Sequence, residues 1–357
     1  MWWPRDSVVI VCLDKERKPT MMNCGLDVGK KSSVFCIVDQ NRKVRKQGTV
    51  RNRFDQLAKR FGSMEPMRII IEASTKSFWL ADRLEELGHD AIVVDPGRTK
   101  AIGAARIKHD KLDARVLAEL GAADLLARVD RPSEKQRLER LVVVGRDVLV
   151  RTRVQMVNVV RSILDSEGME LRGCSTNGFV KAVREQWSEL AEPMRLALEP
   201  VLQAIEKLTE QIAQCDQRID ERLSSDPEMQ RLMTVDGVGP IVAASFLFAV
   251  RNAGRFDSGR QVGAYLGLVP SLYQSGKTYR RGRITKCGNR QARWALCVAA
   301  NALLRTKRPS ALKQWGLELA QRVGRKKAVV AVARKLASVM WSMLKNGRDF
   351  EPRVATA

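Results

Sequence analysis

The segment from residue 21 to about residue 120 constrains the fold most, because short apolar runs alternate there with turn residues and amphipathic stretches. Strands are predicted at 24–27, 33–38, 44–50, 69–72 and 91–94, and helices at 53–62, 77–87 and 110–120. The helix at 77–87 ends before Gly88, and the last strand is stopped by Asp95-Pro96-Gly97. Three strands therefore precede the first helix, after which strands and helices alternate, and this order predicts an α/β domain.

This order is that of the ribonuclease-H-like (RuvC-like) fold, in which the first and fourth strands lie side by side. Asp27 ends the first predicted strand and Glu72 ends the fourth, so we expect the two carboxylates to meet. Asp110 and Asp113 are three residues apart and share one face of the next helix. Clustered carboxylates repel one another unless a cation lies between them. The four acids are thus candidate metal ligands and catalytic residues.

Metal held by such acids suits phosphodiester chemistry. Two Mg²⁺ ions roughly 4 Å apart align a nucleophile with the leaving oxygen and neutralise the phosphate. Mg²⁺ prefers carboxylate oxygen, and Mn²⁺ is a possible substitute. The alternative is structural: Asp110 could form surface salt bridges with Lys111 and Arg115, and Asp27 could cap a turn.

Composition narrows the partners of the chain. Its formal net charge is +23, which favours a polyanionic partner such as nucleic acid. The only histidines are His89 and His109, so chemistry built on a histidine base is not expected. The seven cysteines have no CxxC spacing, which argues against zinc and a disulfide framework and favours reduced thiols in the cytoplasm. No apolar run is long enough for a membrane span, so no membrane partner is expected.

Residues 134 to 225 are predicted to form long helices. Apolar residues there follow a heptad spacing that is typical of a coiled coil or a helical hairpin. They are Val201, Ile205, Leu208, Ile212, Cys215 and Ile219. This seam could join two copies of the chain into a dimer, or it could pack within its own domain.

Residues 228 to 357 are predicted to form a further, mainly helical domain. Gly237-Val238-Gly239 opens a helix at Pro240 and resembles a helix-hairpin-helix motif, which grips a DNA backbone without reading its sequence. The alternative is an ordinary glycine loop. From Ser271 to Met340 the chain has 17 Lys and Arg residues and one acid, Glu318. A block of one sign favours DNA or RNA over a solvated helix face.

Candidate nucleic-acid contacts follow from these two features. They are Gly237, Gly239, Lys277, Arg280, Arg281, Arg283, Lys286 and Arg290. Tyr273, Tyr279, Trp294 and Trp315 are interleaved with the basic residues and could stack on bases, although core packing is the more common use of tryptophan.

Several of these segments together resemble the insertion-sequence 110 family of DEDD transposases, over residues 22 to 350. The matching segments are Gly25 to Lys31, Ile71 to Ser74, Lys111 to Arg115, Leu266 to Pro270, Ser275 to Lys277 and Arg281 to Arg290. Piv-type DNA invertases share the family's architecture. The resemblance implies a RuvC-like DEDD metal-binding domain at 21–130, a coiled-coil or helical linker at 131–227 and a transposase domain at 228–357.

The resemblance also implies a mechanism. Family members are recombinases of mobile elements, guided by a structured noncoding RNA that pairs with donor and target DNA. Asp27, Glu72, Asp110 and Asp113 would bind Mg²⁺, and Ser275 would be the nucleophile that forms a covalent DNA-phosphoserine intermediate. Family active sites combine acids and serine from different protomers, which implies a homo-oligomer, either a dimer or a tetramer.

Other interpretations remain open from the sequence. Ser271, Tyr273 and Tyr279 are rival nucleophiles close to Ser275. A RuvC-type endonuclease that uses metal-activated water and a non-catalytic nucleic-acid scaffold are the alternative functions. The chain departs from the family in residues 1–20, expected to be a poorly ordered extension, and in Cys287, where a basic residue is common.

Overall fold

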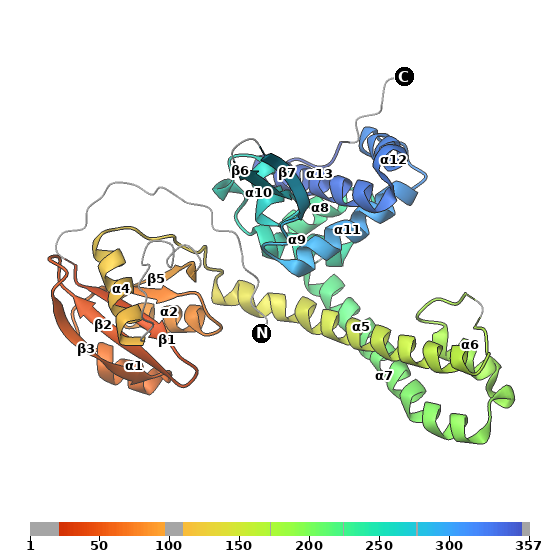
Figure 1. Cartoon of the computed structure of the whole chain (residues 1–357), viewed down its shortest axis with the longest axis horizontal. Coiled ribbons are helices and arrows are strands. Elements are labelled where there is room, and N and C mark those ends of the chain that lie inside the picture. The colour runs from red at the N-terminus through yellow and green to blue at the C-terminus, as the bar shows by residue number, and fades with distance from the viewer. Residues whose placement is uncertain (1–20, 97–109, 172, 224, 276–277, 352–357) are drawn as a thin grey trace. The chain divides into compact units, whose positions relative to one another are not determined.

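The computed structural model describes residues 21–96, 110–171, 173–223, 225–275 and 278–351 (Figure 1). The predicted extension at 1–20 and His109 therefore lie outside the described residues. Contacts divide the chain into two compact units, one formed by residues up to 134 with 254–290 and one by 135–253 with 291–357.

A five-stranded sheet is the centre of the N-terminal part, with strand order β3-β2-β1-β4-β5. The strands are β1 (Asn23–Val28), β2 (Ser32–Val38), β3 (Val44–Arg51), β4 (Arg68–Glu72) and β5 (Asp90–Val94). The helices are α1 (Phe54–Phe61), α2 (Ser77–Glu86) and α4 (Asp110–Ala122). β1 pairs antiparallel with β2 and parallel with β4, which confirms the predicted contact between the first and fourth strands.

Strand alternation gives this sheet two buried faces. Ile69 and Ile71 pack with Leu57 of α1 and Leu80 of α2 on one face, and Ile70 packs with the α4 side on the other. Doubly covered strands are expected to be continuously apolar where they are buried, as β4 is at Ile69, Ile70 and Ile71. The apolar runs in the sequence are continuous because helices cover both faces of the central strands.

Two long helices follow: α5 (Glu134–Ser166) and α7 (Glu192–Leu223), with α6 (Phe179–Glu185) and the short η1 (Trp187–Glu189) between them. Ile205, Ile212 and Ile219 of the predicted seam are each less than 5% exposed. Ile205 belongs to a core cluster with Val157 and Val160 of α5. The seam thus packs at least partly within the chain, as in the helical-hairpin alternative.

The C-terminal region is mainly helical. Its helices are α8 (Pro227–Met233), α9 (Pro240–Val250), η2 (Ala253–Arg255), α10 (Gly259–Tyr265), α11 (Arg290–Arg305), α12 (Ala311–Val323) and α13 (Arg325–Asn346). It also contains a two-stranded hairpin, β6 (Pro270–Ser275) and β7 (Thr278–Ile284), which the sequence patterns did not predict. No helix within the described residues is long and apolar enough to cross a membrane.

Candidate catalytic and nucleic-acid-binding site

The carboxyl ends of β1 and β4 form an acidic edge of the sheet, defined here by Asp27 and Glu72. Leu26 is paired with Ile71 in the parallel register, so the residue after each comes next at the same edge. Both carboxylate side chains are half-buried. The expectation that β1 and β4 bring these two acids to neighbouring strand ends is consistent with this register.

Helix α4 is seated directly on β1 at Gly25. A Cβ atom on Gly25 would lie 1.9 Å from the carbonyl oxygen of Ala114 and 2.6 Å from the backbone nitrogen of Ala118. Farther along α4, a Cβ on Gly121 would lie 2.3 Å from Cδ1 of Ile70 and 3.2 Å from Oδ1 of Asn23. Since Asn23 begins β1, helix α4 runs from the acidic edge toward the opposite edge of the sheet.

This direction places the first turn of α4 toward the acidic edge. Asp113 directly precedes Ala114, the residue in contact with Gly25, and its side chain is exposed. Asp110 begins the helix, and its side chain lies outside the described part of the structure. Arg115, named in the structural alternative, has Nε 2.7 Å from Oε1 of Glu119 and donates a hydrogen bond to it.

Among the described side chains, no group of three His, Cys, Asp or Glu residues is close enough together to hold a metal ion. The predicted ligand set is therefore not complete in Asp27, Glu72 and Asp113 alone. The donor chemistry still fits a divalent cation, because carboxylate oxygens at a strand edge and on a facing helix are the ligands that Mg²⁺ prefers.

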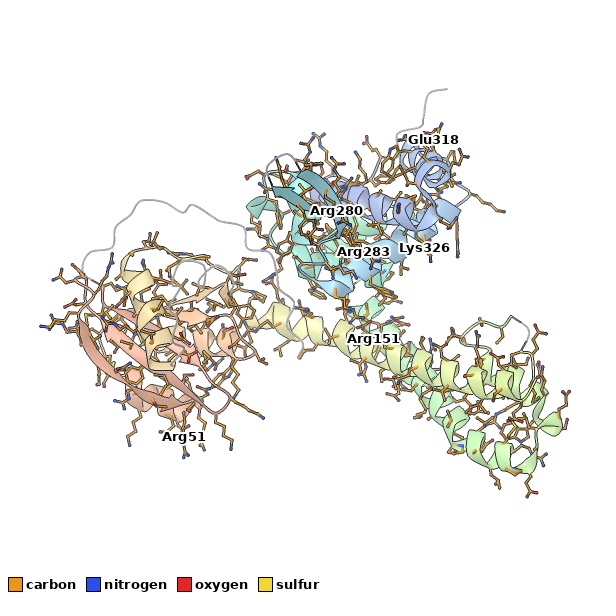
Figure 2. The ribbon with its side chains drawn as sticks, in the orientation of Figure 1. Arg51, Arg151, Arg280, Arg283, Glu318 and Lys326 are labelled. Atoms are coloured by element: carbon orange, nitrogen blue, oxygen red, sulfur yellow. The ribbon has the colours of Figure 1, made fainter. Side chains whose placement is uncertain are left out.

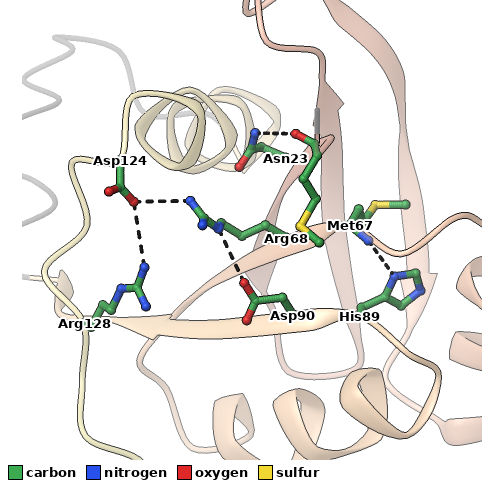
Figure 3. A network of polar contacts seen from close by, with 8 residues as sticks. Asn23, Met67, Arg68, His89, Asp90, Asp124 and Arg128 are labelled. Atoms are coloured by element: carbon green, nitrogen blue, oxygen red, sulfur yellow. Dashed lines mark hydrogen bonds and ion pairs between the residues drawn. The ribbon is translucent and has the colours of Figure 1, made fainter. Parts of the chain in front are cut away.

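The opposite edge of the sheet holds an ionic network that fixes the far end of α4 (Figure 3). Arg68 at the start of β4 lies 3.5 Å from Asp90 of β5 and 3.2 Å from Asp124, just after α4. Asp124 also pairs with Arg128 at 3.8 Å. The helix is thus anchored at its C-terminal end, with its acidic N-terminal turn at the other edge.

His89 is buried beside this network (Figure 3) and has a structural environment. The backbone N–H of Met67 donates to its Nδ1 at 3.3 Å, and its Nε2 lies 3.2 Å from the carbonyl oxygen of Phe61. Burial lowers the pKa of His89, so the neutral ring with a proton on Nε2 satisfies both contacts. His89 is therefore part of the core rather than of the acidic edge.

The β6–β7 hairpin carries Ser275 and several predicted nucleic-acid contacts. Ser275 ends β6 and is paired with Thr278 across the turn, while Tyr273 is paired with Arg280. The side chains of Ser275 and Thr278 lie outside the described part, as do residues 276–277, which include the predicted contact Lys277.

Both faces of this hairpin are solvent-exposed. Leu272, Tyr273 and Tyr279 are 59%, 63% and 56% exposed. A two-stranded hairpin with no buried face is only marginally stable by itself. Exposed aromatic rings beside arginines are typical of surfaces that bind nucleic acid. The dipeptide Gly276-Lys277, whose glycine is typical of a hairpin turn, was the sequence signal that could have revealed the hairpin.

Side-chain contacts distinguish the candidate nucleophiles near Ser275. Ser271 Oγ lies 3.1 Å from the carbonyl oxygen of Arg283 and donates to it, and a Cβ on Gly282 would approach Ser271 Oγ to 2.4 Å. The Ser271 hydroxyl is thus engaged with the backbone of the opposite strand. The hydroxyl of Tyr279 accepts a hydrogen bond from Arg281 Nε at 3.1 Å.

The predicted arginine contacts lie on exposed surfaces. Arg280, Arg281, Arg283, Lys286 and Arg290 all have exposed side chains. Figure 2 labels Arg280 and Arg283 on β7, and also Lys326 and Glu318, the single acid of the basic block. Their exposure leaves the arginine side chains accessible to a polyanion.

The predicted helix-hairpin-helix lies between α8 and α9. Gly237 has φ +85°, and a Cβ there would lie 2.7 Å from the carbonyl oxygen of Ala299 in α11. Gly239 caps the N-terminus of α9, and no atom lies within 4 Å of the place where its Cβ would be. Gly237 therefore serves packing, whereas Gly239 leaves an open approach to the start of α9.

Comparison with known proteins adds a family to this geometry. Residues 24–168 match a model of DEDD transposases, and residues 229–315 match the model described as Transposase IS116/IS110/IS902 family. The chain is 30% identical to a probable family 20 transposase of Pseudomonas aeruginosa, covering 92% of this chain and 98% of that protein. It is 25% identical to the transposase for insertion sequence element IS1111A of Coxiella burnetii, covering 95% and 96%.

A partial match points the same way. The pilin gene-inverting protein of Moraxella bovis is 26% identical over 41% of this chain and 47% of its own length. The two family models and the relatives matched over nearly their full length show the family. The chain belongs to the IS116/IS110/IS902 family of insertion-sequence transposases, enzymes that cut and rejoin DNA.

Proposed function

We propose that this transposase cuts and rejoins DNA through a covalent phosphoserine at Ser275, with Mg²⁺ bound by Asp27, Glu72, Asp110 and Asp113 of a RuvC-like domain. The DEDD family indicates use of a divalent metal. The observation that carries the proposal is the β1–β4 register, which brings Asp27 and Glu72 to neighbouring strand ends, with the first turn of α4 directed to the same edge.

Bound Mg²⁺ would supply charge neutralisation at the phosphate and a lowered barrier to attack. The chain's own residues would do the rest. Ser275 Oγ would attack phosphorus and lose its proton, while the bond from phosphorus to one sugar oxygen breaks and that oxygen gains a proton. In the second transfer a hydroxyl of another strand attacks the same phosphorus and releases Ser275. The phosphoester is conserved, so rejoining requires no external energy.

We further propose that a structured RNA guides the enzyme to donor and target DNA and that the active enzyme is a homo-oligomer. The exposed hairpin and its arginines support a nucleic-acid role, since Arg280, Arg281 and Arg283 present positive charge beside two exposed tyrosines. Arginine can contact the backbone of either DNA or RNA, so the RNA requires its own test.

Trapping of protein–DNA adducts tests the nucleophile. We expect a covalent adduct with the wild-type chain and with Tyr273→Phe, and none with Ser275→Ala. Ser271→Ala is the matched control, because Ser271 lies on the same strand and its hydroxyl donates to the backbone.

Three outcomes distinguish the alternatives. Strand cleavage that persists in Ser275→Ala would indicate a nuclease that uses water. Full activity of Asp113→Ala would exclude this acid from the metal site. Absence of any cleavage by the wild-type chain, with its copurifying RNA and Mg²⁺ present, would favour a scaffold. Sequencing of that RNA tests for a guide, since a guide must contain segments complementary to the element's DNA.

A further inference from the structure

A cavity of about 650 Å³ lies in the C-terminal helical region, away from the acidic edge and the hairpin in sequence. It is bounded by the N-terminal part of α12, the second half of α13 and residues 348–351. All three belong to the same compact unit. Its volume is within the range of small-molecule sites, roughly 300–1,000 Å³.

Two glycines beside the cavity lie where the backbone is most constrained. A Cβ on Gly316 of α12 would lie 2.7 Å from Cγ2 of Val332 and 2.8 Å from Cδ2 of Leu304, so α12 is seated closely at this one point. At Gly347, with φ +64°, the chain leaves α13 in the left-handed conformation that glycine favours. Residues 348–351, which follow, form one wall of the cavity.

That wall is held in place by α8. The backbone N–H of Phe350 donates to Oγ1 of Thr234 at 3.0 Å. Asp349 lies 3.6 Å from Nε of Arg231. Because residues 349 and 350 are fixed by these two contacts, the cavity is a built feature of the described chain and not a gap beside a loose segment.

The chemistry of the lining suits a flat, neutral, polar ligand. Two partly buried aromatic residues, Trp315 and Phe350, line the cavity together with the amide of Asn346. The charged lining residues are Lys335, Arg348, Asp349 and Glu351. Two cations and two anions balance, which disfavours a phosphate group as the occupant.

The basic residues near the cavity in sequence favour nucleic acid as the source of such a ligand. Between residues 305 and 335 the chain has ten Lys and Arg residues and a single acid, Glu318. A surface of this charge attracts the phosphate backbone of nucleic acid. Bases that leave a helix stack on aromatic side chains and hydrogen-bond through their edges.

We propose that this cavity binds an unpaired nucleobase of the nucleic acid that the transposase handles, with Trp315 as the stacking platform. Phe350 and Asn346 complete the site. The proposal depends only on nucleic-acid binding by this region, and it is independent of the nucleophile and the metal.

The probe is a short duplex with one bulged 2-aminopurine, compared with the same duplex in which that 2-aminopurine is paired with thymine or uracil. DNA and RNA versions show which nucleic acid supplies the base. We expect the full-length chain to bind one bulged probe more tightly than its paired form, and to change its 2-aminopurine fluorescence. Loss of stacking in Trp315→Ala should weaken binding of the bulged probe by roughly 5- to 150-fold.

Controls separate a base site from a folding defect. Trp315→Phe keeps an aromatic ring and should restore most of the preference for the bulge. Trp79→Ala, on α2 and 36% exposed, removes a tryptophan outside the cavity and should leave the preference unchanged. Phe350→Ala removes the other aromatic ring of the lining and tests the site if Trp315→Ala does not fold.

The proposal is overturned if the wild-type chain binds bulged and paired probes equally in both DNA and RNA. It is also overturned if folded Trp315→Ala or Phe350→Ala keeps the full preference for the bulged probe.

Discussion

Gly25→Ala is the sharpest test of how the acidic edge is assembled. The added methyl group would lie 1.9 Å from the carbonyl oxygen of Ala114, whereas ordinary contacts of this kind are 3.4 Å or longer. The nearest atoms are the carbonyl oxygen of Ala114, the backbone nitrogen of Ala118 and Cβ of Leu117. None of them belongs to the flexible end of a side chain, so none can move aside by itself. Helix α4 must therefore shift away from β1 by about 1.5 Å, the difference between these two distances.

Two effects of different size should follow. Overpacking of this kind costs about 1–3 kcal/mol of unfolding free energy. The same shift would move the first turn of α4, with Asp110 and Asp113, away from Asp27 and Glu72. A misplacement of roughly 1 Å in a catalytic constellation can reduce the rate about 100-fold. We expect cleavage to fall by about this factor or more, while the chain remains folded.

The assays are urea unfolding and cleavage of DNA carrying the element's ends, in the presence of the copurifying RNA and Mg²⁺. Gly145→Ala on α5 is the control, because no atom lies within 4 Å of its Cβ position. Ala in a helix interior should stabilise by about 0.5–1 kcal/mol there and leave cleavage unchanged. Wild-type stability and cleavage in Gly25→Ala would refute the seating of α4 on β1 and the site argument built on it.

Two further predictions concern pH and salt. Burial lowers the pKa of His89, so the unfolded chain takes up a proton first as the pH falls. The unfolding free energy should therefore decrease as the pH falls below about 6.5, and His89→Gln should show a flatter profile in urea titrations between pH 5 and 8. An identical pH profile in the two chains would contradict this account. The logarithm of the association constant for DNA should fall steeply with the logarithm of the salt concentration. Arg280→Gln and Arg283→Gln should each reduce this slope by about 1 where the side chain contacts a phosphate. A flat slope for the wild-type chain would argue against the basic block as a phosphate-binding surface.

The N-terminal sheet could be predicted from the sequence because each of its signals is local. A run such as Ile69 to Ile71 is apolar at every residue, which indicates a strand covered on both faces. Five strands in this order along the chain leave few topologies. The pairing of β1 with β4, which puts Asp27 and Glu72 at neighbouring strand ends, followed from that order.

The β6–β7 hairpin was not predicted because neither face of it is buried. Alternation of apolar and polar residues marks a strand only when one face packs against a core. Here Leu272 and Tyr273, neighbours on opposite faces, are 59% and 63% exposed. No periodic pattern results, and only the turn Gly276-Lys277 hinted at the pairing.

The heptad seam illustrates a different limit. Its spacing is the same whether the partner helix comes from the same chain or from another copy. Only the structure shows that Ile205 packs with Val157 and Val160 of α5. The α7 seam is therefore occupied at least partly within the chain, which the spacing alone could not show.

The two edges of the sheet carry residues of different chemistry, and this difference leads to the last prediction. At the amino edge Arg68 and Arg128 pair with Asp90 and Asp124, so two cations face two anions, and His89 contacts two backbone groups. At the carboxyl edge, Asp27 and Glu72 end neighbouring strands, and Asp113 lies on the first turn of α4. Carboxylates brought to one edge repel one another, and a divalent cation bound between them would relieve that repulsion. A divalent cation should therefore stabilise the wild-type chain more than a chain in which Asp27 is replaced by Asn.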